Sequence, residues 1–301
     1  MAGIVLLGIA LPPVGVALRP FAGEAIFLLL VLAFLRADLS ALKRNLTRPG
    51  LVLAATGWSM FAVPALASAA LLGLGVETRA PELFAALMLQ ALASPVMSAP
   101  AFAALMGLDA TLTLAVLILS SALVPFTAPG FAAALGLGVQ LSPLALGAKL
   151  GLILAGSAFV ALLLRRWVSP RQIERRRDEI DGLNIAILYI FVAALTSNFA
   201  EQTIAAPLRV AGLTALAFGI YFVLVALTVL LFRRAGTERA FAIAVASSQR
   251  NMGLMLAATG GALPELVWLY FAVAQFPIYL APLMLGPVLR RLVPAGAGAR
   301  A

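Results

Sequence analysis

The sequence predicts an all-α membrane protein of ten transmembrane helices, arranged as two inverted repeats of five helices each. Three observations support this fold class: a very apolar composition, ten apolar runs, and basic residues concentrated in alternate links. Of the 301 residues, 63% are hydrophobic and 11% are charged, and the mean hydropathy is +1.08. Since a soluble protein carries roughly 25% charged residues, we expect a bilayer to be the solvent of this chain.

The ten apolar runs are separated by charged clusters and by links rich in Gly and Pro. A helix needs about 20 residues to cross the hydrocarbon core, and the second run, which contains Glu24, is the shortest. The first run could be a signal peptide, but it lacks a basic start and a cleavage site, so we expect it to be a helix. The runs lie at residues 2–18, 21–35, 50–75, 80–106, 110–137, 143–164, 183–199, 204–232, 239–260 and 264–289.

Basic residues in the links set the expected orientation. Sixteen of the 21 Lys and Arg residues lie in the links after the second, sixth and eighth runs and in the C-terminal tail. The opposite side has Arg19 and Arg79 in its links, with Arg209 just inside the eighth run. Because ten spans bring all the strongly basic links to one side, we expect both termini in the cytoplasm beneath an inner (plasma) membrane. Residues 165–181 fit an orientation signal, with lipid-headgroup binding as the alternative.

Composition also excludes several function classes. The chain has no Cys and no His, which excludes disulfides, thiolate or imidazole metal ligands, and nucleophiles that need a His base. The net charge of +9 lies in short links rather than along a face with stacking aromatics, so we expect no nucleic-acid partner. We expect that the protein is not an enzyme and binds no cofactor or metal, because no pair of acidic residues lies at membrane depth.

The fourth run of each predicted repeat is interrupted well inside the bilayer. We divide the chain into residues 1–137, residues 138–292 and a cytoplasmic tail, 293–301. The interruptions lie at 94–100 and 247–253, and Ser247 follows Ser94 by 153 residues, about half the chain. Inverted repeats with discontinuous helices are typical of secondary transporters, although a packed proline kink would explain either interruption alone.

The interrupted segments carry the residue types that a transport site needs. Pro95 and Pro100 each remove a backbone donor, and a carbonyl freed in this way is tolerated at membrane depth only against protein or water. Half-helix ends that face such a space bind ions and charged substrates. We therefore predict a substrate site formed by Ser94, Pro95, Ser98, Pro100, Ser247, Ser248, Gln249, Arg250, Asn251 and Gln275.

Arg250 is the most informative residue of the predicted site. It lies about 17 Å from the near end of its helix, too far for its side chain to reach the headgroups. Burial at the centre of a membrane helix costs about 2.5–3.5 kcal/mol. No acidic residue lies near the middle of any predicted helix. We therefore expect Arg250 to face an anionic substrate, with pairing to helix carbonyl ends as the alternative.

Two segments resemble the bile acid:sodium symporter family. The first runs from Ser94 to Pro129 and contains Ser-Pro-x-Met-Ser-x-Pro, Gly-x-Asp and Ser-Ser-x-Leu-Val-Pro; the second is Gln-Arg-Asn-Met-Gly-Leu at 249–254. The resemblance implies a panel domain of helices 1, 2, 6 and 7 and a core domain of helices 3–5 and 8–10. It also implies that helices four and nine cross at unwound centres, beside which an organic anion binds during alternating access.

The departures from the family pattern concern the sodium sites. Thr113 keeps a hydroxyl group at a family ligand position and belongs to the predicted site. The other sodium-site positions correspond to Ala99, Pro100, Leu117, Ala246 and Arg250. Because a hard cation needs oxygen ligands, the resemblance favours transport without sodium, with Arg250 in place of the bound cation. A second hypothesis gives Arg250 the acidic group of the substrate as its partner.

We therefore expect a secondary transporter for a small organic anion, acting as a monomer in the bilayer by uniport, exchange or proton-linked transport. Two alternatives stay open: a ligand sensor on a transporter fold, and a sodium symporter with altered ligands. Arsenite carriers share the broad architecture, but their relatives use a membrane Cys that this chain lacks, and auxin-carrier-like efflux proteins stay possible relatives.

Overall fold

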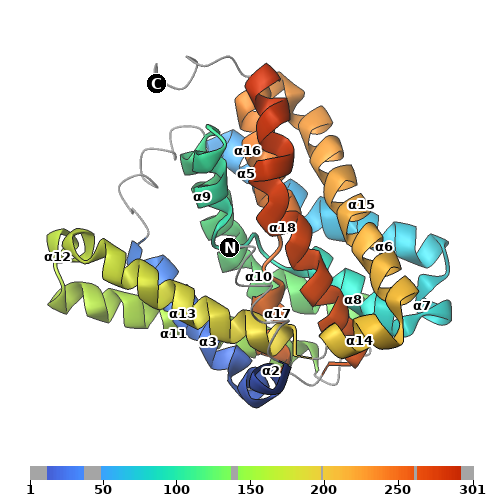
Figure 1. The fold of residues 1–301 in the computed structure, drawn as a ribbon. Coiled ribbons are helices and arrows are strands. Elements are labelled where there is room, and N and C mark those ends of the chain that lie inside the picture. The colour runs from blue at the N-terminus through green and yellow to red at the C-terminus, as the bar shows by residue number, and fades with distance from the viewer. Residues whose placement is uncertain (1–11, 37–48, 137–141, 198, 261–262, 293–301) are drawn as a thin grey trace.

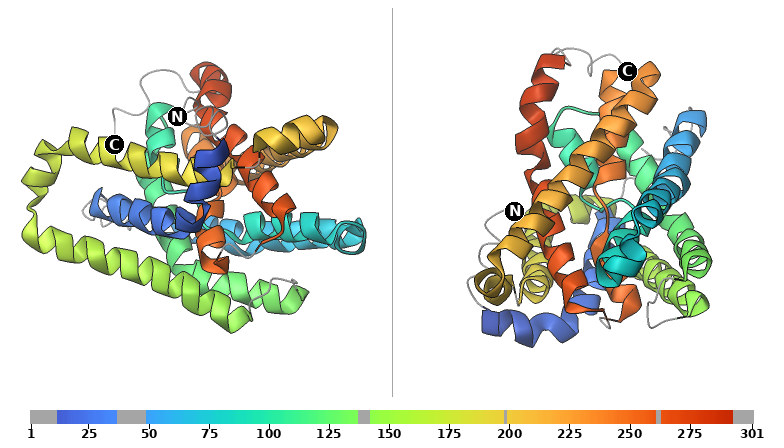
Figure 2. Two further views of the ribbon diagram at one scale, coloured as in Figure 1. Left: turned by 60° about the horizontal axis from the view of Figure 1, so that its bottom comes forward. Right: turned by 90° about the vertical axis from the view of Figure 1, so that its right-hand side faces the viewer.

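The structure is a computed structural model that describes residues 12–36, 49–136, 142–197, 199–260 and 263–292. Helices make up almost all of these ranges, and their arrangement is shown in Figures 1 and 2. Seven of the described helices are long and apolar enough to cross a membrane: Pro13–Leu35, Pro49–Gly73, Ala110–Leu135, Pro143–Trp167, Asp178–Ala205, Pro207–Ala235 and Glu265–Leu292. The prediction of an all-α, multi-pass membrane protein is confirmed at this level.

One side of the molecule is formed by five helices, called here the α3 group (Figure 2, left panel). Within it, α3 packs against α11 and α13, and α13 packs against α2. The boundary expected between the first two apolar runs is a single 3-10 turn, Arg19–Phe21, so both runs contribute to one candidate span. The group comprises α2 (Pro12–Leu18), α3 (Ala22–Arg36), α11 (Pro143–Trp167), α12 (Pro170–Arg175) and α13 (Arg177–Leu195).

The remaining helices form the α16 group, in which α15 packs against α16 and α18. Its helices are α5 (Pro49–Gly57), α6 (Val63–Gly73), α7 (Val76–Arg79), α8 (Pro81–Leu92), α9 (Ala99–Leu105), α10 (Ala110–Leu135), α14 (Phe199–Ala205), α15 (Pro207–Phe232), α16 (Thr237–Ser248), α17 (Met252–Thr259) and α18 (Glu265–Leu292). A π-helical turn, Trp58–Ala62, joins α5 to α6, and a 3-10 turn, Arg233–Ala235, follows α15.

Local sequence signals explain where several helices begin. The carboxylate of Asp109 accepts a hydrogen bond from the Leu112 amide at 2.8 Å and so caps the N-terminus of α10. The Ser142 hydroxyl caps α11 in the same way, accepting from the Ala145 amide at 3.2 Å. Pro occupies the first position of α8, α11 and α15, where its missing N–H has no helical acceptor to bond.

Burial distinguishes the helices at the centre from those at the surface. In α16, every residue from Ala240 to Ser248 is buried, and most of α17 is buried as well. By contrast, α11 and α15 expose large apolar side chains such as Leu144, Leu152 and Leu208. A helix that is apolar and buried on all sides belongs at the centre of a bundle, whereas exposed Leu residues suit contact with lipid.

Candidate functional site

Two helices of the α16 group are broken, and their unwound segments cross each other. The first break separates α8 from α9 at residues 93–98, and the second separates α16 from α17 at residues 249–251. At the crossing, the Val96 amide donates to the Gln249 carbonyl and the Asn251 amide donates to the Ser94 carbonyl, both at 2.8 Å. These bonds make an isolated antiparallel bridge between Pro95 and Arg250.

The two breaks have different local causes. Pro95 disfavours the helical conformation at Ser94, the residue before it. The first break is therefore explained by the local sequence. The second break contains no proline. There, the Ser248 hydroxyl bonds back to the Ala244 carbonyl at 2.7 Å, and Asn251 caps α17 by accepting from the Leu254 amide at 3.0 Å. The crossing bonds satisfy the extended backbone between these two ends.

Arg250 joins the crossing to the π-helical turn between α5 and α6. Its side chain is only 2% exposed. One terminal nitrogen, Nη1, donates to the Ser59 hydroxyl at 3.1 Å and to the Ala93 carbonyl at 2.9 Å. The other, Nη2, donates to the Ser59 carbonyl at 3.1 Å. All three acceptors are neutral oxygens, which matches the predicted alternative of pairing with helix carbonyl ends.

The Ser59 carbonyl is available to Arg250 because of the π-helical turn. In a regular helix it would accept from the Val63 amide, but that amide bonds to the Trp58 carbonyl instead. The next donor along the chain would be residue 64, which is proline and has no N–H. The turn and the proline therefore free one buried carbonyl, and the guanidinium group satisfies it.

A cavity of about 650 Å³ lies beside the crossing, between the two helix groups. We call it the crossing cavity. Its wall on α13 runs from Asp181 to Phe191, which corresponds to about 15 Å along the helix. On the opposite wall lie residues 96–98, 250–253 and parts of α10 and α18. Most of the lining is apolar, and the polar members are Ser98, Asp181, Asn184, Arg250, Asn251, Gln275 and Tyr279.

The structure divides the predicted site residues into two sets. The first set lines the crossing cavity and comprises Ser98, Pro100, Arg250, Asn251 and Gln275, together with Leu117 from the altered sodium positions. The second set is buried outside the cavity lining and comprises Ser94, Pro95, Thr113, Ser247, Ser248 and Gln249, together with Ala99 and Ala246.

Residues of the second set lie between helices of the α16 group. The Thr113 hydroxyl contacts the Asp109 carbonyl at 3.0 Å and the Ala242 carbonyl at 3.3 Å, so it joins α10 to α16. Within the described chain, the hydroxyl of Ser247 and the side-chain amide of Gln249 are buried without a hydrogen-bond partner. These side chains therefore pack against the crossing within the α16 group, and they do not line the crossing cavity.

Three residues at the site were missed by sequence reasoning. Asp181 was assigned to a basic link, but it lies on α13 and lines the cavity with Asn184 one turn further on. Ser59 was not singled out, although a proline five residues after it was a usable signal. Asp181 could have been found from the helical spacing of 181, 184, 185 and 188, which all line one face of α13.

Some oxygens at the crossing already have a partner, whereas the side-chain oxygens of Ser94, Ser247 and Gln249 have none in the described chain. The Ser59 and Ala93 carbonyls, which could serve as cation ligands, already accept from a guanidinium group, and Ala99, Leu117 and Ala246 offer no side-chain oxygen. In the ranges that the structure describes, no group of three or more acidic residues gathers as a metal site.

The fold and its apolar helices define the chain as a multi-pass, all-α membrane protein. The chain matches no protein-family model, and comparison with curated proteins finds no significant match. A more specific assignment therefore depends on the geometry of the crossing and on the resemblance of its two segments.

Proposed function

We propose that this protein is a secondary transporter that moves a small organic anion across its membrane by alternating access, without sodium. In this proposal it is a divergent relative of the bile acid:sodium symporter family, with ten helices in two inverted repeats. The α3 group would correspond to the panel domain and the α16 group to the core domain. The observation that carries the proposal is the crossing of two broken helices beside a cavity between these groups.

Arg250 supplies the positive charge of the proposed site. Its three hydrogen bonds to neutral oxygens hold the guanidinium group at the crossing, and none of these acceptors carries a charge. The N-terminal end of α17 begins at Met252 in the cavity wall and adds a partial positive charge. We therefore assign Arg250 the role of a fixed internal cation that makes the cavity favourable for an anion.

The same contacts favour this role over direct capture of the substrate. A guanidinium group has five N–H donors, and three of those of Arg250 already bond to protein oxygens. The remaining donors include Nε, which is buried and has no partner in the described chain. Direct contact with a carboxylate would therefore need a rearrangement at the crossing. The neutral polar residues that line the cavity, and so are available to the substrate, are Ser98, Asn184, Asn251, Gln275 and Tyr279.

The proposal is tested by flux measurements with purified protein in liposomes. A panel of small organic carboxylates is first screened by thermal shift, and ligands that stabilise the protein are then assayed for uptake. We expect uptake to be unchanged when sodium is replaced by choline. A collapse of uptake without sodium would refute sodium independence, and binding without flux would indicate a ligand sensor on a transporter fold.

A further inference from the structure

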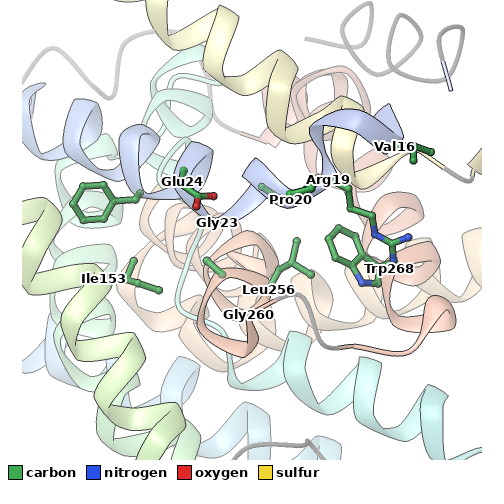
Figure 3. Close-up of a pocket in the computed structure, with 12 residues that line it drawn as sticks. Val16, Arg19, Pro20, Gly23, Glu24, Ile153, Leu256, Gly260 and Trp268 are labelled. Carbon is green, nitrogen blue, oxygen red and sulfur yellow. The ribbon is translucent and has the colours of Figure 1, made fainter. Parts of the chain in front are cut away.

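A second cavity of about 650 Å³ lies at the other end of the interface between the two helix groups. We call it the Arg19 cavity (Figure 3). The helices α3 and α17 line both cavities. On α17, Gly253 lines the crossing cavity, whereas Leu256 and Ala257 line the Arg19 cavity. Since three residues of helix span about 4.5 Å, only a thin layer of side chains separates the two spaces.

That layer is closely packed around Gly253. A side chain as small as a methyl group at this position would collide with Ile26 on α3 and would lie 3.0 Å from the Phe191 ring on α13. The two helix groups therefore touch directly at the level of the crossing. A path between the two cavities past Gly253 requires this contact to separate.

Beyond this layer, Arg19 joins the two groups a second time. Its guanidinium group bonds to the Glu265 carboxylate at 2.7 Å and lies 4.2 Å from the centre of the Trp268 ring. Figure 3 shows Arg19 lying against Trp268. The space enclosed by Arg19, Glu265, Trp268 and their neighbours on α13 and α14 is only about 10 Å³, too small for more than one water.

Arg19 is fixed to the α3 group by the helix that precedes it. A Cβ atom on Gly15 would lie within 2.9 Å of Ser197 and would collide with the Ala193 carbonyl, so α2 and α13 are in backbone contact. Glu265 and Trp268, in contrast, belong to the first turn of α18 in the α16 group. The ion pair and the cation–π contact therefore connect two groups that alternating access would move apart.

We propose that Arg19, Glu265 and Trp268 form a latch that closes the route from the Arg19 side of the membrane to the crossing cavity. This inference rests on the proposed function, because a route through the protein matters only to a transporter. Arg19 is 25% exposed and Glu265 is 55% exposed, and an ion pair of this kind is weak. A weak, partly solvated contact suits a gate, since it breaks and reforms in every transport cycle.

The latch is tested by thiol labelling, which needs no known substrate. The chain contains no Cys, so a single introduced Cys is the only reactive thiol. Ala101→Cys places the reporter in the crossing cavity, and Ala257→Cys places it in the Arg19 cavity. A membrane-impermeant maleimide is applied to intact cells and to inverted vesicles, and the face from which Ala257→Cys reacts faster is the Arg19 face.

From the Arg19 face, we expect Ala101→Cys to react slowly in the otherwise wild-type chain. Adding Arg19→Gln should raise its labelling rate about three- to tenfold, because the ion pair and cation–π contact are both lost. The matched control is Arg209→Gln, which removes an exposed Arg from the start of α15 and should leave the rate unchanged. The reversed pair, Arg19→Glu with Glu265→Arg, should restore slow labelling.

The latch would be refuted by an unchanged rate in Arg19→Gln, by equal acceleration in Arg209→Gln, or by a reversed pair that labels as fast as the single variant. If Arg19→Gln does not fold, Glu265→Gln provides the same comparison from the other side of the pair. A chain that labels as expected but carries no anion would support the latch and overturn the transporter, so the two failures are distinguishable.

Discussion

Replacing Arg250 with Met tests whether the guanidinium group holds the crossing together. Met fills much of the aliphatic volume but donates no hydrogen bond, so the oxygens of Ser59 and Ala93 lose their buried partner. Three hydrogen bonds from a charged donor contribute about 1.5–3 kcal/mol each, or about 4.5–9 kcal/mol together. Removing a buried charge recovers about 2.5–3.5 kcal/mol. We therefore expect the free energy of unfolding to fall by about 1–6.5 kcal/mol.

The assay is denaturant unfolding in detergent micelles, followed by circular dichroism, because the described chain is almost entirely helical. Arg290→Met is the matched control: Arg290 is exposed in the last turn of α18, and its loss should change stability by less than about 0.5 kcal/mol. Arg250→Lys keeps the charge with fewer donors and should fall between the wild type and Arg250→Met.

A small-molecule rescue separates lost bonding from general damage. Arg250→Ala leaves space at the crossing, and methylguanidinium supplied in excess should raise its melting temperature without affecting the wild type, because it binds only the folded variant. Two results would contradict the role of Arg250 at the crossing. One is an Arg250→Met variant as stable as Arg290→Met; the other is an equal rise in the melting temperatures of Arg250→Ala and the wild type with methylguanidinium.

Three further predictions follow from buried contacts. Gly253→Ala should destabilise the protein by about 1–3 kcal/mol through overpacking against Ile26, and adding Ile26→Ala should recover part of the loss in the same unfolding assay. Tyr270→Phe should lower the free energy of unfolding by about 1–3 kcal/mol, because the Tyr270 hydroxyl bonds to Gln90 in the core. A double variant with Gln90→Leu that is less stable than Tyr270→Phe alone would contradict this. Asn251→Ala should lower the free energy of unfolding by about 1 kcal/mol through loss of the α17 cap, whereas Asn251→Ser, which keeps a neutral capping oxygen, should not reproduce the full loss in thermal unfolding.

The apolar helices and their capping were accessible from sequence because both depend on residues close together in the chain. The high mean hydropathy of the chain indicates that it lies in a bilayer. Runs of about 20 apolar residues then indicate helices, because backbone groups in lipid can form hydrogen bonds only within their own segment. Asp109 could be recognised as an N-cap for the same local reason. The count of ten spans stays a prediction. Each broken helix is too short in its halves to qualify, the described parts of the first two apolar runs belong to one candidate span, and residues 1–11 lie outside the described ranges.

The two breaks show where local information ends. Ser94 and Pro95 carry their own reason for leaving the helix, whereas residues 249–251 owe their extended backbone to a partner strand 155 positions away, counted from Pro95 to Arg250. Polar residues of the interrupted segments looked equivalent in sequence, yet Ser98 and Asn251 line the cavity while Gln249 is buried behind it. Only the pairing of the two segments in the folded chain assigns each side chain to one face or the other.

Sequence alone predicted an all-α membrane protein and an Arg250 too deep in its helix to reach the headgroups, because hydropathy and helix rise are properties of short segments. The tertiary structure decided what Arg250 does at that depth. Its acceptors come from Ser59 and Ala93, which precede it by 191 and 157 residues. One of them is available only because a π-helical turn and a proline leave a carbonyl unbonded, and no local pattern around Arg250 contains that information.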